Sequence, residues 1–444
     1  MTLNATKYIM SASGGGESYW AAFLGGSSDD EFLDLAIDSN GDIVALGSTA
    51  SDGAGTKDFL IAKFDKNGDL LWDRTLGLSS ASFNGRSVDV DSSDNIIVSG
   101  YGPVSGQGEQ WILAKYNSSG VLQWDKHIGP SGGTSADRSF GVAIDSSDDI
   151  IGVGWIQTAP SYQQEAVVAK FSSSDGSITW QRKLDGTGDD NYNDVKVDSS
   201  DNVYAIGYSA SSGGAGNNDF LIVKYNSSGT IQWKKVLGGT GTDTGYGIEV
   251  DSSANVYIIG YSTSSGVAGG FDYLLAKYNS SGTFQFDKIL GGLSNDFGYG
   301  VTVDSSGNIY VVGSSASAGP GSYSAVLAKY NSTGVVQWQN SFGGTGNSRY
   351  YRIKLDADEN IYFCGWDSNA GAGGDEAALV KVRSDGSGTG TFGSFTYATS
   401  TLTANDITLT DQTAGANDAG ISMVSNDATF TDAPAVLTST KVNM

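Results

Sequence analysis

Short apolar runs alternate with small polar turns along most of the chain. Within residues 245–290, Val256-Tyr257-Ile258-Ile259 follows the polar turn 252–255, and the run 272–278 precedes the turn 279–282. Runs of four to eight residues rich in Val, Ile, Tyr and Phe, bounded by Asn, Asp, Ser and Gly, are typical of β-strands. This stretch therefore predicts four consecutive strands, and the repeated units show no apolar stripe at helical spacing.

Three sequence markers each recur seven times, at intervals of about 53 residues. The first marker is an aromatic residue, found at Trp20, Trp72, Trp124, Trp180, Trp233, Phe286 and Trp338. The second is a turn aspartate, found at Asp38, Asp91, Asp145, Asp198, Asp251, Asp304 and Asp356. The third is a lysine, found at Lys63, Lys115, Lys170, Lys224, Lys277, Lys329 and Lys381. The chain therefore contains seven copies of one unit.

Four strands in a unit of this length predict a β-propeller blade. The predicted fold class is all-β, with a seven-bladed propeller of four-stranded blades over residues 19–383. A lead-in (1–18) precedes it, and a linker and extended C-terminal arm (384–444) follow. Residues 19–24 can supply the missing fourth strand of the blade formed by 352–382, which leaves no exposed sheet edge; residues 391–397 are the alternative. We expect the seven aromatic markers to be buried between the sheets.

The composition disfavours several classes of partner. Aspartate and glutamate outnumber lysine and arginine by 49 to 25, which gives a formal charge of −24. Such an acidic surface repels nucleic-acid phosphates and anionic membrane surfaces. Residues 1–16 hold neither a basic cluster nor an apolar run, so we expect no secretory signal, and no stretch approaches the length of a membrane-spanning helix. We therefore expect neither nucleic acid nor a membrane as a partner.

The acidic turns between first and second strands, such as 38–42 and 198–202, resemble calcium loops in composition. Calcium takes six to eight oxygen ligands, whereas each turn offers one or two carboxylates. Asp, Ser, Asn and Gly are also what tight hairpin turns need. Because the turns occur in all seven units, we expect scaffold and predict no metal or cofactor, with calcium as the alternative. The seven lysines are interpreted in the same way, each with its stem on the neighbouring strand's Trp and its head on a turn carboxylate; the alternative is a functional ring of positive charge.

Residues suited to catalysis are sparse. Cys364, the only cysteine, lies inside a predicted strand, and His127, the only histidine, belongs to a different unit. A cysteine nucleophile needs a nearby base, so we expect Cys364 to be a small buried hydrophobe. No paired carboxylates, Ser-His-Asp set or His/Cys cluster stands out. We therefore predict a protein that is not an enzyme.

A binding site is expected where the units differ. The loops between second and third strands vary most, together with those that join each fourth strand to the next unit. In a propeller both sets open on one face, and rigid scaffolds commonly carry recognition on such loops. Aromatic side chains there can stack on sugar rings or pack on a partner. The candidate ligand-binding residues are Tyr162, Phe271, Tyr323 and Tyr350, and isolated surface aromatics are the alternative interpretation.

After residue 383 the repeat ends. Residues 384–393 form a Gly/Ser/Thr linker, and the remainder has β-leaning residues but too few large apolar ones for a core of its own. Such a segment commonly gains order by adding a strand to a neighbour. We expect residues 395–444 to be an assembly or attachment arm, and a disordered tail is the alternative.

The unit Gly-x-x-Val-Asp-Ser-Ser-Gly-Asn-Ile-Tyr-Val-x-Gly … Leu-Ala-Lys-Tyr-Asn-Ser-x-Gly-x-x-Gln-Trp, clearest over residues 300–338, resembles the SBBP family of β-propeller repeats. The resemblance covers about residues 19–383 and carries over no catalytic residues. The family occurs in secreted bacterial proteins and in virion proteins of marine tailed phages. The opening segment and the Thr/Ser/Ala/Asp tail are more similar to the phage members.

The resemblance implies a structural virion protein, assembled in the host cytoplasm and placed on the phage tail (fibre, nozzle or tip). The ring would act there as a display, adaptor or host-surface recognition module. The expected partners are other virion proteins, in an oligomeric arrangement within the particle, and a host surface glycan. The alternatives are a secreted or cell-surface bacterial carbohydrate-binding propeller and, after that, a lyase- or hydrolase-like propeller enzyme.

Overall fold

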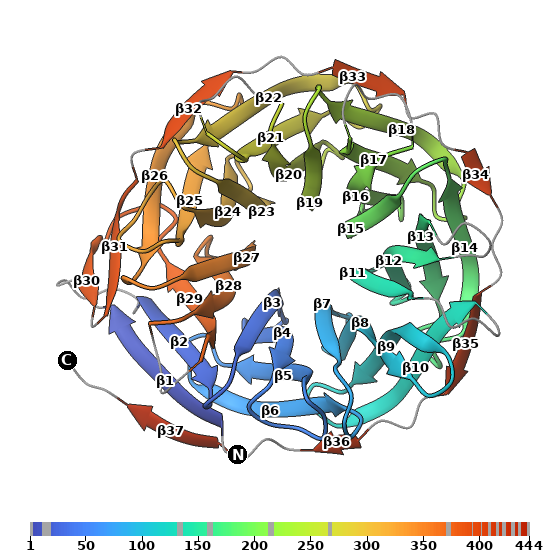
Figure 1. Ribbon diagram of the computed structural model, residues 1–444, viewed down its shortest axis with the longest axis horizontal. Coiled ribbons are helices and arrows are strands. Elements are labelled where there is room, and N and C mark those ends of the chain that lie inside the picture. Colours follow the sequence, from blue (N-terminus) through green and yellow to red (C-terminus); the bar gives the residue numbers. More distant parts are fainter. Residues whose placement is uncertain are drawn as a thin grey trace.

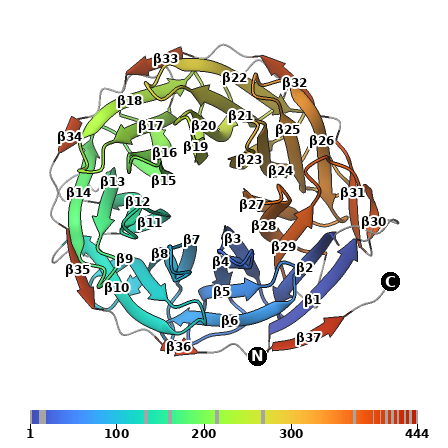
Figure 2. The same cartoon turned by 180° about the vertical axis from the view of Figure 1, so that it is seen from behind.

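The strands of the computed structural model form a closed ring of seven sheets around a central axis (Figure 1). The structure describes residues 3–10, 19–130, 136–157, 163–211, 217–264, 269–369, 374–392, 394–400, 402–406, 410–413, 417–419, 423–427, 431–433 and 437–441. The first strand of each blade lies nearest the axis, and the view from behind shows the same radial order (Figure 2). None of the described segments forms a helix long and apolar enough to cross a membrane. The predicted seven-bladed, all-β propeller is confirmed.

Each blade is an antiparallel sheet of four strands in radial order. Blades 1 and 2 consist of β3 (Asp30–Ile37), β4 (Ile43–Thr49), β5 (Asp58–Phe64) and β6 (Leu70–Gly77), then β7 (Asn84–Val90), β8 (Ile96–Val104), β9 (Gly108–Tyr116) and β10 (Leu122–Pro130). Blades 3 and 4 consist of β11 (Arg138–Ile144), β12 (Ile150–Gln157), β13 (Gln164–Phe171) and β14 (Ile178–Asp185), then β15 (Asp190–Val197), β16 (Val203–Ser209), β17 (Asp219–Tyr225) and β18 (Ile231–Gly238). Blades 5 and 6 consist of β19 (Asp243–Val250), β20 (Val256–Ser262), β21 (Asp272–Tyr278) and β22 (Phe284–Gly291), then β23 (Asp296–Val303), β24 (Ile309–Ser315), β25 (Ser324–Tyr330) and β26 (Val336–Gly343).

Blade 7 is built from both ends of the chain. It contains β27 (Ser348–Leu355), β28 (Ile361–Asp367), β29 (Glu376–Val382) and the N-terminal β2 (Tyr19–Gly25), in that order. β2 pairs antiparallel with β29, from Trp20 opposite Lys381 to Leu24 opposite Ala377. The predicted closure by residues 19–24 is confirmed, and the alternative segment 391–397 is not used for it. That segment contributes to β30 (Gly390–Phe392) and β31 (Phe395–Thr399), which join blade 6 instead.

The predicted lead-in contains a strand of the propeller. β1 (Leu3–Met10) pairs antiparallel with β2 over its whole length, from Asn4 opposite Gly25 to Met10 opposite Tyr19. The outer edge of β2 would otherwise present unpaired N–H and C=O groups at the rim. β1 satisfies these groups and gives blade 7 a fifth strand.

The C-terminal segment passes around the rim and adds one strand to each blade in reverse order (Figures 1 and 2). β31 pairs with β26 of blade 6. Five further strands then pair with β22, β18, β14, β10 and β6 in turn: β32 (Thr403–Asp406), β33 (Thr410–Thr413), β34 (Asn417–Ala419), β35 (Met423–Asp427) and β36 (Thr431–Ala433). Finally, β37 (Leu437–Lys441) pairs parallel with β1. We call β31–β37 the rim strands; the strand addition predicted for the arm occurs here on the chain's own blades.

The aromatic markers lie at the junctions between blades, each against a glycine turn of the next blade. Gly229 has a φ of +76°, and a Cβ there would lie 2.8 Å from the ring of Trp180. The indole N–H of Trp180 donates to the carbonyl of Ser227 in the same turn (3.1 Å). The expectation that all seven are buried is wrong for six, which are half-buried. Only Trp20 is fully buried, because β1 covers its whole strand while the rim strands pair with only the far ends of the other fourth strands.

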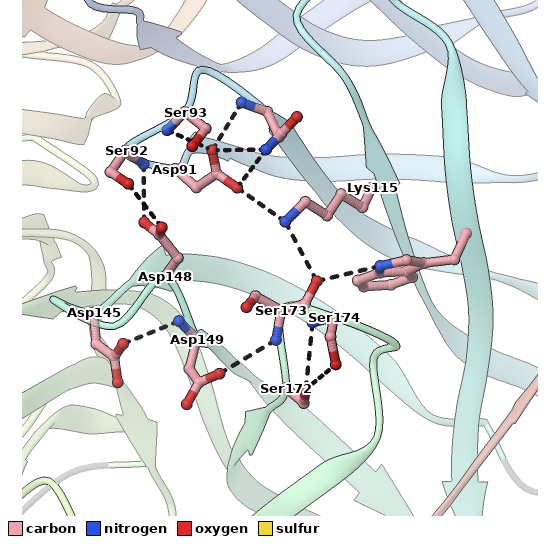
Figure 3. Close-up of polar contacts among 12 residues, drawn as sticks. Asp91, Ser92, Ser93, Lys115, Asp145, Asp148, Asp149, Ser172, Ser173 and Ser174 are labelled. Carbon is pink, nitrogen blue, oxygen red and sulfur yellow. Dashed lines mark hydrogen bonds and ion pairs between the residues drawn. The ribbon is translucent and has the colours of Figure 1, made fainter.

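The turns between first and second strands join neighbouring blades (Figure 3). Ser92 donates from its N–H and its hydroxyl to Asp148 of the next blade, at 2.9 and 2.7 Å. Within its own turn, Asp91 accepts the N–H groups of Ser93 and Asn95, at 3.0 and 2.8 Å. The turn carboxylates thus have the scaffold contacts that were predicted. In the described part of the chain, no group of three or more acidic, histidine or cysteine side chains is arranged to hold a metal ion.

The marker lysines reach the turn carboxylates in two ways. In blades 1 to 3 the ion pair is direct, as between Lys115 and Asp91 at 2.9 Å (Figure 3). In blade 4, the hydroxyl of Tyr204 donates to Asp198 (2.9 Å), and Lys224 stands 4.0 Å from that carboxylate. Lys224 lies 4.8 Å above the ring of Tyr204, so the ring beneath it is this second-strand tyrosine and not the predicted Trp. The predicted pairing of lysine and turn carboxylate is confirmed for six of the seven lysines, at 4.0 Å or less.

Cys364 belongs to the core. It lies in β28, is fully buried and has no disulfide partner. Burial raises the pKa of its thiol well above the usual value, so the group stays protonated. His127 lies in β10 of blade 2, and blade 1 stands between it and blade 7. Cys364 is therefore the small buried hydrophobe that the sequence predicts.

Candidate functional site

The inner strands surround a hollow of about 530 Å³ at one end of the axis, which we call the axial funnel. Its aromatic lining consists of Phe140, Trp155, Tyr208, Tyr246, Tyr299 and Tyr351. Its polar lining consists of Glu31, Arg86, Arg138, Gln164, Asn191, Asn193 and Arg352. Small-molecule sites typically have about 300–1,000 Å³ and combine aromatic walls with a few placed polar groups. The funnel has the size and composition of such a site.

A β-bulge in each inner strand presents one side chain to the funnel. The pairing of β19 with β20 passes from Gly245 to Gly247, so Tyr246 has no partner across the ladder. Bulges re-aim a side chain and are common beside binding sites. The same irregularity occurs in all seven blades, and the bulge residues are Leu33, Arg86, Phe140, Asn193, Tyr246, Tyr299 and Tyr351. All seven line the funnel. The residues of the funnel lining therefore differ from blade to blade, whereas the residues of the scaffold repeat.

Arg352 forms the floor of the funnel. Its guanidinium lies 3.6 Å from Asp34 and 3.7 Å from Asp194, which belong to blades 1 and 4. It also donates to the carbonyl oxygens of Tyr246 and Tyr299 (3.2 Å each). One side chain thus ties together five blades around the axis. Arg352 also lines a small neighbouring space of about 20 Å³, room for one water molecule.

Three arginines line the funnel of a chain that is acidic overall. Arg138 pairs with Glu109 (2.7 Å) and stacks over the rings of Tyr101 and Trp155, with 4.6 and 5.4 Å from its guanidinium carbon to the ring centres. Arg86 also lies over the ring of Tyr101, at 5.3 Å. Cation–π contacts of this kind fix a guanidinium without neutralising it. The funnel wall therefore holds positive charge in defined positions.

The tyrosines of the funnel are poor acid–base groups near neutral pH. Burial raises the pKa of Tyr208 and of Tyr351 to about 12. Burial raises the pKa of Tyr246 and Tyr299 further. All four hydroxyls are therefore protonated at neutral pH, where they can donate hydrogen bonds to a ligand but cannot serve as a base.

Two of the predicted site residues continue the aromatic wall outward. Phe271 contacts Tyr261 and Phe297, with ring centres 4.8 and 5.3 Å apart, and Tyr323 lies 6.3 Å from Phe297. Phe297 in turn stacks with Tyr299 of the funnel at 6.2 Å. Phe271 and Tyr323 thus belong to one run of rings that starts at the funnel wall. They are half-buried, so they are components of the wall and not isolated surface aromatics.

Tyr350, another predicted residue, is not part of the funnel lining. Tyr350 lies within β27 and is fully buried, with its ring 5.8 Å from Phe342 and 5.0 Å from Phe363. Its inclusion among the loop aromatics is wrong, because it points away from the bulge position occupied by its neighbour Tyr351 and into the junction of blades 6 and 7. Tyr162 falls outside the described residues.

Sequence reasoning missed the bulge residues, although a signal for them exists. Each lies five residues before the turn aspartate of its unit, as Arg86 does before Asp91 and Tyr246 before Asp251. At this fixed offset the residue is Leu, Arg, Phe, Asn or Tyr, and its two neighbours also change between units. The signal is therefore the regular offset from the turn aspartate and not the variation alone.

The fold has many similar solved structures at low identity. A Bacteroides caccae protein of unknown function is 10% identical, with 63% of this chain and 89% of that chain covered and a TM-score of 0.39. The Neurospora crassa Pan2 WD40 domain is 9% identical, with 79% and 89% covered and a TM-score of 0.48. A periplasmic gluconolactonase of Pseudomonas aeruginosa is 8% identical, with 76% and 94% covered and a TM-score of 0.43. We base no argument about function on likenesses of this degree.

The sequence comparisons identify the repeat. No curated protein matches the chain. The family model described as SBBP, beta-propeller repeat, matches residues 232–266 and 286–319, which fall in blades 4 to 6 of the ring. The chain is thus a seven-bladed β-propeller with SBBP-type repeats at residues 232–266 and 286–319.

Proposed function

We propose that the protein is a non-enzymatic recognition module that binds a saccharide in the axial funnel. The observation that carries the proposal is the hollow of about 530 Å³ whose wall combines six aromatic side chains with amides and arginines. Aromatic faces pack on the C–H faces of sugar rings, and planar polar side chains bind the hydroxyl groups between them. The size suits a short oligosaccharide.

The amide side chains are placed to give this site its selectivity. Gln164 accepts from the hydroxyl of Tyr208 (2.9 Å), so its carbonyl is held in place at the wall. Asn191 donates to Asn193, and Asn193 donates to the carbonyl of Gly245 (2.7 Å each). Side chains fixed by such bonds lose little further entropy when a ligand binds.

Two features support a role without catalysis. The funnel tyrosines have raised pKa values, so a saccharide held there would meet hydrogen-bond donors and no phenolic base. The only cysteine and the only histidine lie in blades 7 and 2, away from each other and from the funnel lining. A test for slow turnover is incubation of the bound saccharides with the protein, followed by mass spectrometry of the sugars.

The experiment for binding is titration calorimetry of the full chain against oligosaccharides selected on a glycan array. Replacing Tyr246 by alanine removes one ring from the wall, which is expected to weaken binding about tenfold, as loss of an aromatic contact and its buried area predicts. Val121, which is 53% exposed in the turn at the other end of blade 2, provides the control Val121→Ala. Binding that is unchanged in Tyr246→Ala, or no binding to any saccharide, would contradict the proposal.

The virion assignment remains a prediction from the resemblance to phage members of the family. In this proposal the ring is carried on the tail of the particle, in contact with other virion proteins, and the funnel faces a host surface glycan. Mass spectrometry of purified phage particles tests it, with a fixed copy number of this chain as the expected result. Recovery of the chain only from the medium or from a bacterial surface would favour the secreted carbohydrate-binding alternative.

A further inference from the structure

We infer that the saccharide bound in the axial funnel carries an anionic group, a carboxylate or a sulfate, and that Arg86 binds this group. The inference rests on the proposed function, since it specifies the ligand of the same site.

Arg86 is the one charged residue of the funnel wall without an opposite charge within 4.0 Å among the described residues. Glu31 pairs with Lys57 (2.7 Å), and Arg138 pairs with Glu109 (2.7 Å). The fourth charged residue, Arg352, lies between two aspartates at the floor. Unlike the other charged residues of the wall, Arg86 is therefore a cation without a nearby counter-ion in the part of the chain that the structure describes.

The guanidinium of Arg86 has unused hydrogen-bonding capacity. One terminal nitrogen donates to the hydroxyl of Tyr101 (2.9 Å), which is a neutral partner. Its Nε is shielded from solvent and has no hydrogen-bond partner among the described residues. A shielded donor on a cation is costly unless a ligand satisfies it. The residue as a whole is only half-buried and lines the funnel, so an anion entering the funnel can approach this cation.

Aromatic contacts hold this guanidinium in position for a ligand. Its central carbon lies 5.3 Å from the ring centre of Tyr101 and 5.4 Å from that of Phe140. Burial lowers the pKa of Arg86, but Tyr101 and Glu31 raise it by more, so the group stays charged. The planar fork of arginine fits the two oxygens of a carboxylate or sulfate. Arg86 therefore has the placement and the charge to select an acidic sugar.

The test compares matched oligosaccharide pairs by titration calorimetry in 50 mM salt. One pair is an oligogalacturonate and its methyl ester, and the other is a sulfated galactan oligosaccharide and its desulfated form. We expect the acidic member of one pair to bind at least about tenfold more tightly, and the pair that shows this distinguishes carboxylate from sulfate. The ratio of the affinities for the acidic and the neutral member is expected to fall towards one in Arg86→Gln and to be retained in part in Arg86→Lys.

The control is Arg74→Gln. Arg74 also lies over an aromatic ring, that of Trp72 at 5.6 Å, but it is in β6 at the rim and not in the funnel lining, so this variant should keep the full preference. Equal binding of both members of each pair to the wild-type chain would overturn the inference and leave the saccharide proposal intact. Absence of binding by every member would overturn both. If Arg86→Gln does not fold, competition by inorganic sulfate replaces it: displacement of the acidic member alone supports the inference, and no displacement contradicts it.

Discussion

The substitution Ala254→Asp is expected to stabilise the ring by adding a contact between blades 4 and 5. Four other junctions have this contact, in which a serine donates twice to a carboxylate of the next blade, as Ser92 does to Asp148. Ala254 occupies the position of Asp148, and Ser199 occupies that of Ser92. Ala254 has a φ of +58° and Asp148 one of +64°. An aspartate at 254 would therefore point its carboxylate at Ser199.

The magnitude follows from two contributions. The existing serine–aspartate bonds are solvent-exposed, with 2.9 Å from N–H and 2.7 Å from hydroxyl to carboxylate at Asp148, so about 0.5 kcal/mol each is appropriate, at the low end of the usual range. The left-handed conformation disfavours alanine and is better tolerated by aspartate, which adds about 0.5 kcal/mol. The sum is about 1.5 kcal/mol. With an unfolding entropy near 2 cal/mol/K per residue, a ring of this size would gain between about 1 and 2 °C in Tm.

The assay is a double-mutant cycle measured by denaturant and thermal unfolding. Ala254→Gly relieves the backbone conformation without adding an acceptor, and it pays the entropy of glycine in the unfolded chain, so its gain should be smaller. In the background of Ser199→Ala, the N–H of residue 199 can still donate to the new carboxylate, so the gain from Ala254→Asp should fall by about 0.5 kcal/mol, the share of the lost hydroxyl. The reasoning fails if Ala254→Asp is no better than Ala254→Gly, or if its gain is the same with and without the hydroxyl of Ser199.

Two further predictions concern pH and the rim strands. Burial raises the pKa of Asp137 to about 7, and burial together with the charge of Asp243 raises the pKa of Asp219 to about 6. In the unfolded chain both carboxyls have a pKa of about 4. Their protonation in the folded state therefore contributes fully to the free energy of unfolding below about pH 4, and this contribution is lost as the pH rises through 6 and 7. Tm should therefore fall between pH 5 and 8, and less steeply in Asp137→Asn, so equal slopes would refute the assignment. Ending the chain after Leu402 removes β32–β37 and uncovers the outer edges of five blades and of β1. Exposed strand edges pair with other chains, so sedimentation velocity of the truncated protein should show self-association. A truncated chain that stays monomeric, with unchanged Tm, would show that the rim strands contribute little to stability.

The repeated features of the molecule could be predicted because each of them occurs seven times. The turn aspartates and the marker lysines were predicted to pair because both recur in every unit, as Lys115 and Asp91 illustrate. A contact that recurs in sequence at a fixed interval reveals both its partners and its role. Ring closure was predictable for a related reason, since β2 is the copy of the fourth strand that blade 7 lacks.

The rim strands and β1 could not be assigned from the sequence. Rim strands such as β34 and β36 are three residues long, too short for an apolar alternation that would identify a partner. They attach by main-chain hydrogen bonds to strand edges, and any residue except proline can make those bonds. The sequence therefore predicts that such a segment can add to a sheet, but it does not specify that the sheet belongs to the same chain.

The sequence did not predict the funnel, because the residues that line it do not recur from unit to unit. A bulge residue such as Arg86 lies outside the strand ladder, so the ladder places few demands on its side chain and the repeat does not preserve it. Predicting a site from aromatic residues in the loops captured the outer part of the wall, with Phe271 and Tyr323, but included Tyr350, which the core requires. Counting five residues back from the turn aspartate of each unit locates all seven bulge residues at once. Since ligand contacts, unlike scaffold contacts, differ from blade to blade, that position is where specificity can change without loss of the ring.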